Sequence, residues 1–255
     1  MEWCSPPTEL TPQMDQVQIW RANLQAPSET IENYYLLLAA DEQARANRFH
    51  FQKDRNRYVV ARGILRSILS RYLYLPPQAL QFSYSPTGKP FLLHPQVDPL
   101  LCFNLSHSDE CVLCGVAWNR EVGIDIEKIR LERNCEGIAE RFFAPSEQAA
   151  LNQLSPDLWH QGFFNCWTRK EAFLKATGQG LTIPLDQLVV SLAPNEPAQI
   201  LRTGWNPAEA ARWSVKALEV GDGYAAAVVV AGQGWQIATW DFDVVSSPSL
   251  DKAED

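Results

Sequence analysis

The sequence of 255 residues lacks an apolar run of about 20 residues, the length that a membrane-spanning helix needs. Residues 1–16 contain neither the basic stretch nor the apolar stretch of a secretory signal. Basic residues are too few to balance the acidic ones, and the net charge of -8 disfavours non-specific binding to nucleic acid or anionic membrane. We therefore expect a cytoplasmic protein that binds neither.

Cysteine is present at six positions, but the sequence lacks the paired motifs that a zinc or redox site would need. Cys111 and Cys114 form a C-x-x-C, which can be half of such a site. No second C-x-x-C exists, and the segment around this pair has the pattern of a strand. Because free cysteine packs like a small apolar residue, we interpret both as reduced strand residues.

Two nucleotide and hydrolase motifs are also missing. The turn Thr87–Pro90 contains Gly88 and Lys89, but the G-x-x-x-x-G-K-[ST] frame of a P-loop is absent. No G-x-S-x-G is present, and the adjacent Ser106 and His107 are poorly placed to act as nucleophile and base. The sequence therefore favours neither a P-loop NTPase nor a serine hydrolase.

Hydrophobic periodicity predicts helices followed by strands, twice along the chain. Helices are predicted at 28–39, 41–49, 53–73, 135–143, 146–154 and 157–177. Strands are predicted at 17–22, 81–85, 91–93, 102–105, 112–118, 122–127, 188–192, 212–218, 224–231 and 236–240. This order indicates an α+β fold of two lobes with mostly antiparallel sheets.

The predicted domain organisation follows from the repeated order of elements. An N-terminal extension spans residues 1–16, an N-terminal lobe 17–118 and a C-terminal lobe 119–244. A polar, flexible tail is predicted at 245–255. No residue-level repeat relates the two lobes.

Two carboxylates alternate in the segment Val122–Glu127. Alternate residues of a strand share a face, so Asp125 and Glu127 point the same way. Their mutual repulsion needs relief from a cation, a proton or water. A metal site is one interpretation, and a solvated edge with Lys128 and Arg130 as counter-charges is the other.

A third carboxylate lies on the predicted helix 157–177. Trp167, Glu171 and Lys175 are spaced four apart and line one helix face. Alone, this spacing is typical of a surface Glu–Lys pair beside a core tryptophan. Combined with Asp125 and Glu127, Glu171 would complete an oxygen site for magnesium, and Lys175 would then neutralise substrate phosphates.

Other polar residues are candidates for phosphate recognition. Ser106 and His107 end a strand, where they can either bind phosphate or cap a turn. Lys89 in its glycine turn is weak evidence by itself. A basic group surrounds these candidates in the first lobe, and most of its members are expected on solvated helix faces: Arg45, Arg48, Lys53, Arg55, Arg57 and Arg62.

Taken in order, five motifs resemble those of the 4′-phosphopantetheinyl transferases, specifically the larger Sfp-type. They are Gly88–Pro90, Asn104–Ser108, Gly123–Glu127, Arg141–Phe143 and Trp167–Lys175. The likeness covers residues 17–240, and the combination of G-[VI]-D-x-E with W-x-x-K-E-A-x-x-K is highly specific. The resemblance implies two similar lobes packed as a pseudo-dimer, with the active site in the cleft between them.

The resemblance also implies an activity. The enzyme would transfer the phosphopantetheine arm of coenzyme A to a serine of an acyl or peptidyl carrier protein, releasing adenosine 3′,5′-bisphosphate. Fatty-acid, polyketide and nonribosomal peptide synthesis use such carriers. At this length one chain should supply both halves of the site, so a monomer is expected. A magnesium nucleotidyltransferase and a non-catalytic binding protein remain as alternatives.

Residue roles follow from the resemblance by position. Asp125, Glu127 and Glu171 would bind Mg2+, or Mn2+, and Lys175 would contact the pyrophosphate. Contacts to the nucleotide end are implied for Arg45, Lys53, Lys89, Ser106 and His107, with Arg62 as a weaker candidate. Glu42 stands where some relatives have a basic residue.

The mechanism needs a general base for the carrier serine. We predict Glu171, acting directly or through a metal-bound water, with Glu127 as the competing assignment. For carrier docking we predict a surface around Phe142, Phe143 and Lys170.

Overall fold

A computed structural model describes residues 1–94, 98–131 and 134–245 of the chain. The first half contains β1 (Gln16–Asn23), α1 (Ser28–Leu37), α2 (Ala40–Ala46), α3 (Gln52–Leu73), β2 (Gln81–Tyr84), β3 (Pro90–His94), β4 (Leu101–Ser108) and β5 (Cys111–Trp118). The second half contains β6 (Val122–Lys128), α4 (Cys135–Phe142), α5 (Pro145–Asn152), α6 (Pro156–Thr177), β7 (Leu188–Val190), β8 (Ile200–Thr203), α7 (Glu209–Arg212), β9 (Trp213–Ala217), β10 (Tyr224–Ala231) and β11 (Gln236–Asp241). The predicted α+β class is confirmed.

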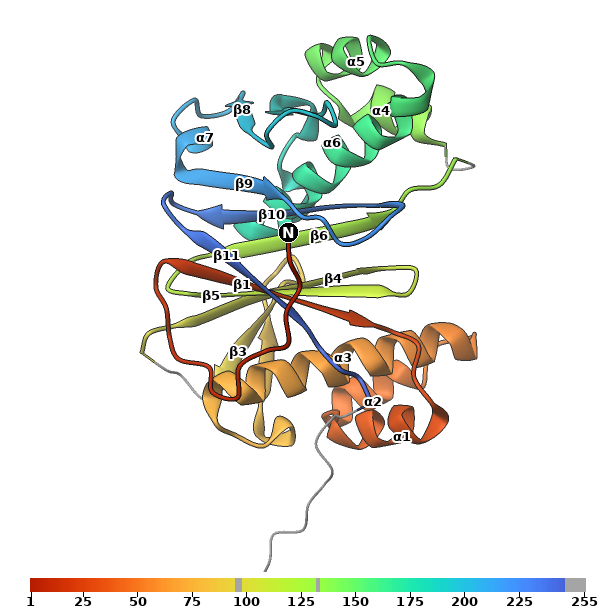
Figure 1. Cartoon of the computed structure of the whole chain (residues 1–255), viewed down its shortest axis with the longest axis vertical. Helices are drawn as coiled ribbons and strands as arrows, with labels where there is room; N and C mark the ends of the chain where they lie inside the picture. Colours follow the sequence, from red (N-terminus) through yellow and green to blue (C-terminus); the bar gives the residue numbers. More distant parts are fainter. Residues whose placement is uncertain (95–97, 132–133, 246–255) are drawn as a thin grey trace, which may run out of the picture.

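The two lobes form successive layers. Figure 1 shows α1, α2 and α3 against one sheet, and α4, α5 and α6 beyond a second sheet. The first sheet has the order β11-β1-β5-β4 and the second the order β6-β10-β9. Two further hairpins pair β2 with β3 and β7 with β8. The predicted arrangement of two lobes with small, mostly antiparallel sheets is therefore confirmed.

The last strand crosses the predicted boundary between the lobes. β11 pairs in parallel with β1, from Gln16 opposite Gln236 to Arg21 opposite Asp241. An open strand edge offers unpaired backbone groups, and β11 satisfies those of β1. The second lobe thus lends a strand to the sheet of the first, although the domain boundaries themselves stay a prediction. Residues 246–255 of the predicted tail lie outside the described residues.

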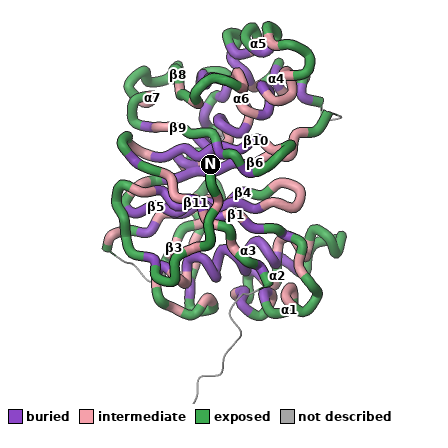
Figure 2. Tube along the Cα trace, in the orientation of Figure 1, coloured by how far each residue is buried: buried purple, intermediate pink, exposed green. Residues whose placement is uncertain are grey.

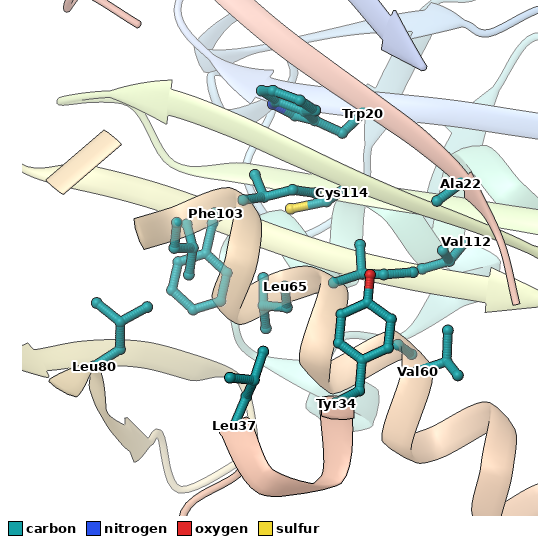
Figure 3. Packing of buried hydrophobic residues seen from close by; sticks show 14 of the residues in the cluster. Trp20, Ala22, Tyr34, Leu37, Val60, Leu65, Leu80, Phe103, Val112 and Cys114 are labelled. Carbon is teal, nitrogen blue, oxygen red and sulfur yellow. The ribbon is translucent and has the colours of Figure 1, made fainter. Parts of the chain in front are cut away.

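Three apolar clusters hold the layers together. The first lies between α3 and the four-stranded sheet, the second between the two sheets, and the third between α6 and the three-stranded sheet. Both faces of β1 are buried, because Ile19 packs toward the other sheet and Trp20 toward α3. Figure 2 shows this buried interior along both sheets and both long helices. Figure 3 shows part of the first cluster, including Tyr34, Leu65 and Phe103.

Two predictions about composition can be compared with the fold. The C-x-x-C lies within β5, with Cys114 buried and Cys111 partly buried, and both thiols are free. The interpretation of this motif as a strand is confirmed. Across the described ranges, no helix combines the length and the apolar character needed to cross a bilayer.

Candidate active site

The two lobes meet where the edge strands β4 and β6 run beside each other. These strands belong to different sheets, and side chains rather than a backbone ladder connect them. Asn104 Oδ1 accepts a hydrogen bond of 2.9 Å from the backbone N–H of Ile124. Ser106 Oγ donates one of 2.9 Å to Asp125 Oδ1. Alternate residues of β4 share one face, and this face meets β6. That is why Asn104 and Ser106 are polar.

The helix α6 approaches β6 closely at Gly123. A Cβ at this position would lie 2.1 Å from the carbonyl oxygen of Ala172 and 2.2 Å from the backbone nitrogen of Ala176. Only glycine permits this approach of two backbones. Glu171 and Lys175 directly precede the two alanines of this contact. The close approach of the helix therefore holds both side chains beside the carboxylates of β6.

Lys175 and Asp125 form the centre of the site. Lys175 Nζ lies 2.7 Å from Asp125 Oδ1 and 2.8 Å from Ser106 Oγ. Asp125 is 4% exposed, and its Oδ2 atom is buried without a hydrogen-bond partner among the described residues. Burial raises the pKa of the Asp125 carboxyl; Lys175 opposes that rise, and Glu127 adds to it. An unpartnered buried carboxylate oxygen is suited to a cation.

Glu171 completes the group of acids. Burial raises the pKa of Glu171, and the charges of Asp125 and Glu127 raise it further, while Lys175 opposes them. The three predicted carboxylates therefore lie within electrostatic range of one another. As the side chains stand, no cluster of three or more His, Cys, Asp or Glu in the described ranges is arranged to hold a metal ion. The metal-ligand set stays a prediction.

A cavity of about 370 Å³ opens beside Lys175. It is lined by residues of both lobes, namely Thr87, Gly88, Lys89, Pro90, Asn104, Leu105, Glu171, Leu174, Lys175, Gly178 and Gly180. The Lys89 ammonium donates to the carbonyl oxygens of Val122 at 3.2 Å and Ala176 at 2.9 Å. Desolvation lowers the pKa of Lys89, although Glu121 and Cys102 oppose this. Lys89 therefore both lines the cavity and ties the end of α6 to β6.

His107 lies on the opposite face of β4 from Ser106 and is open to solvent. Partial desolvation by the neighbouring protein lowers the pKa of His107, and the positive charges of Lys175 and Arg57 lower it further, whereas the charge of Glu127 raises it. Arg57 also pairs with Asp109 at 3.0 Å. Sequence reasoning counted Arg57 among the solvated basic residues. No local sequence pattern distinguishes Arg57 from its basic neighbours, because its partner Asp109 lies 52 positions away.

Three other predicted contacts lie away from this cavity. Arg62 is buried and forms an ion pair with Glu42, which also pairs with Arg66 at 2.7 Å. Burial alone would raise the pKa of Glu42, but the charges of Arg62 and Arg66 lower it overall. Arg45 lies over the ring of Tyr58, 5.3 Å from its centroid.

Lys53 lies at the first turn of α3. It lines a separate hollow beside α1, together with Asn56, Arg57 and Glu110. None of Arg45, Lys53 and Arg62 is among the described residues that line the cavity at Lys175. Their nucleotide contacts stay predictions.

Two of the three residues predicted for the docking surface, Lys170 and Phe143, are buried and cannot contact a carrier, whereas Phe142 is partly exposed. Lys170 is 0% exposed, pairs with Glu147 at 2.7 Å and donates to the carbonyl oxygen of Leu185 at 2.7 Å. Phe143 is 1% exposed. Consecutive residues of a helix point about 100° apart, so Lys170 faces the lobe interior while its neighbour Glu171 faces the cleft.

Comparison with known proteins identifies the class to which this fold and site belong. Residues 20–118 match the model of the 4′-phosphopantetheinyl transferase N-terminal family, and residues 121–229 match that of the 4′-phosphopantetheinyl transferase superfamily. The chain therefore belongs to the 4′-phosphopantetheinyl transferase superfamily and is a phosphopantetheinyl-transferring enzyme.

Individual relatives support this assignment over most of the chain. The 4′-phosphopantetheinyl transferase HetI of Nostoc sp. is 42% identical over 240 residues, which cover 94% of this chain and 98% of the relative. The 4′-phosphopantetheinyl transferase Sfp of Bacillus subtilis is 32% identical over 207 residues, which cover 80% of this chain and 86% of the relative.

Proposed function

We propose that this chain transfers the 4′-phosphopantetheine arm of coenzyme A to a serine of an acyl or peptidyl carrier protein, releasing adenosine 3′,5′-bisphosphate. The observation that carries the proposal is Lys175, whose ammonium lies 2.7 Å from Asp125 beside a cavity lined by Glu171. A cation among gathered carboxylates suits a substrate pyrophosphate accompanied by a metal ion. We infer that a monomer suffices, because one chain matches the family models of both the N-terminal and the C-terminal lobe. We expect the enzyme to act in the cytoplasm.

Asp125, Glu127 and Glu171 would hold a magnesium ion, with manganese as an alternative. The buried Oδ2 atom of Asp125, which has no hydrogen-bond partner among the described residues, supports this assignment. When bound, the ion offsets negative charge on the phosphate oxygens. Lys175 adds a fixed positive charge to the same oxygens, which lowers the energy of the transition state more than that of the ground state.

Glu171 is the general base in this proposal. The carboxylate of Glu171 lines the cavity beside Lys175, where it can accept the serine hydroxyl proton. Glu127 is the competing base, but Ser108 Oγ already donates a hydrogen bond of 3.0 Å to its Oε2 atom. The proton moves to the Glu171 carboxyl as the serine oxygen attacks the phosphorus that carries the pantetheine arm. The bond from that phosphorus to the bridging oxygen of the pyrophosphate breaks, and the oxygen leaves with adenosine 3′,5′-bisphosphate.

The nucleotide end of coenzyme A is assigned to the surface around His107. Desolvation is the main cause of the lowered pKa of His107, and the positive charges of Lys175 and Arg57 lower it further, so both cations act on this surface. Ser106 contacts Lys175 at the cleft between the lobes, and Lys89 lines the cavity there. The role of His107 is to bind the substrate rather than to move the serine proton.

The experiment is incubation of the enzyme with coenzyme A, Mg2+ and a panel of apo-carrier proteins, followed by intact mass measurement. The expected result is addition of one phosphopantetheine to at least one carrier. A nucleotidyltransferase would instead consume a nucleoside triphosphate, so a parallel reaction contains ATP in place of coenzyme A. Unmodified carriers throughout the panel would contradict the proposal.

A further inference from the structure

Ser108 ends β4 and has no role in the function proposed above. Its Oγ atom donates a hydrogen bond of 3.0 Å to Glu127 Oε2. The same atom accepts a hydrogen bond of 3.0 Å from the backbone N–H of Lys128. Ser108 and Glu127 are both half-buried, so water competes less for these bonds than it would at an open surface.

The second of these bonds orients the first. A serine hydroxyl has one proton and two acceptor lone pairs. The N–H of Lys128 can only donate, so it fixes one lone pair of Ser108 and leaves the hydroxyl proton for a carboxylate. Because Lys128 directly follows Glu127, the backbone of β6 and the Glu127 carboxylate are held by a single atom of β4.

Side-chain hydrogen bonds also join β4 to β6 at two earlier positions. Two residues earlier, Ser106 Oγ donates to Asp125 Oδ1, and two residues before that, Asn104 accepts from the N–H of Ile124. Asn104 thereby fixes the register in which the two serines meet the two carboxylates. Each carboxylate of β6 thus has its own hydroxyl on β4.

We propose that Ser108 is a positioning residue that holds the Glu127 carboxylate toward the cation site formed with Asp125 and Glu171. This inference rests on the proposed function. Groups that hydrogen-bond a metal-binding carboxylate set its orientation, and their loss lowers metal affinity about 10- to 100-fold. Loss of the Ser108 hydroxyl would remove one bond that orients the Glu127 side chain, so more of its torsional freedom would be lost when the cation binds.

The competing explanation is that Ser108 only joins the two lobes. Direct titration with Mn2+, followed by electron paramagnetic resonance in the absence of coenzyme A and carrier, separates the two. For Ser108→Ala we expect Mn2+ affinity to fall by about 10-fold or more. Ser108→Thr keeps the hydroxyl and suits a strand, so it should restore most of the affinity.

A matched control removes a serine hydroxyl elsewhere in the same lobe. Ser70 of α3 donates to the carbonyl oxygen of Ser67 at 2.8 Å and is unconnected to the cleft. Ser70→Ala should bind Mn2+ as the unaltered protein does. If Ser108→Ala does not fold, Ser108→Cys replaces it, and its weaker donor should still lower the affinity.

Unchanged Mn2+ affinity in folded Ser108→Ala or Ser108→Cys would overturn the inference. It would also fall if Ser108→Thr lost as much affinity as Ser108→Ala while remaining folded. Neither result would affect phosphopantetheine transfer by the unaltered enzyme. Absence of transfer by the unaltered enzyme would instead contradict the proposed function, so the two failures are distinguishable.

Discussion

Helix α6 carries two lysine–carboxylate pairs that differ in their surroundings. Lys170 and Glu147 are both buried, with side chains 0% and 2% exposed. Lys175 and Asp125 are more open, with side chains 30% and 6% exposed. In the first pair Glu147 also accepts from the backbone N–H groups of Ala144 at 2.7 Å and Val190 at 2.8 Å.

The second pair is incompletely bonded within the described protein, because Asp125 Oδ2 has no hydrogen-bond partner there. The same side-chain chemistry therefore serves two purposes on one helix. A pair with every polar atom satisfied fixes the fold, because breaking it leaves a charge without water. A pair with an unsatisfied buried oxygen beside a cavity is poised to exchange partners. The predictions below test this contrast between the two pairs.

The largest expected effect is on stability, from Lys170→Met. Removal of the ammonium leaves Glu147 as a buried charge without its counter-ion, which costs about 3–5 kcal/mol. The free energy of unfolding, measured by urea titration, should fall by this amount. The double variant Lys170→Met with Glu147→Met removes both charges and should recover much of the loss. A fully stable single variant would contradict the structural role of this pair.

Lys175→Met should lower activity strongly and stability only slightly. Loss of a preorganised positive charge at the phosphates lowers kcat/KM by about 10²- to 10³-fold. The loss of unfolding free energy should be smaller than in Lys170→Met, because Lys175 is partly exposed and Asp125 can take up a proton. Steady-state transfer kinetics and urea titration measure the two quantities. Equal stability losses in the two lysine variants would remove the distinction.

Gly123→Ala should affect stability and activity together. The added methyl group overlaps the backbone of α6 and must push the helix away, at a cost of about 1–3 kcal/mol. The shift moves Glu171 and Lys175 relative to Asp125, so transfer should slow as well. Gly234→Ala controls for the added methyl group, because a Cβ at Gly234 meets nothing within 4 Å, and any stability loss there comes from its φ of +74° alone. Normal transfer by Gly123→Ala would show that the close packing is not needed.

The narrowest predicted effect is that of His107→Ala, which should change substrate binding but not stability. Loss of a hydrogen bond to a charged phosphate costs about 1.5–3 kcal/mol, which corresponds to a rise of about 10- to 100-fold in KM for coenzyme A. The kcat value should change much less, since His107 does not move the serine proton. Initial rates over a range of coenzyme A concentrations give both values. An unchanged KM would contradict the nucleotide-binding role.

The features that the sequence predicts well are those encoded locally. Alternation places Asp125 and Glu127 on one strand face, and Gly178 ends α6 in the left-handed conformation, with φ of 65°. Helix starts were predicted less well. The predicted helices 146–154 and 157–177 each start one residue late, because α5 and α6 begin at Pro145 and Pro156. Proline suits the first turn because its missing N–H has no helical partner there.

The features that sequence reasoning missed depend on distant contacts. The parallel pairing of β11 with β1 joins residues about 220 positions apart, for which no local pattern exists. Lys170 was predicted on the surface because a charged residue is normally exposed. Inside the lobe, however, its ammonium pairs with Glu147 and donates hydrogen bonds to two backbone carbonyl groups. The burial of Arg62 likewise depends on a distant partner, since Glu42 lies on another helix.

Single-turnover transfer by Glu171→Gln tests the central claim most directly. The substitution keeps the shape of the side chain but removes its ability to accept the serine proton. With saturating coenzyme A, Mg2+ and apo-carrier, we expect the formation of holo-carrier, followed by intact mass, to slow by about 10²-fold or more. Transfer at the rate of the unaltered enzyme would contradict the account.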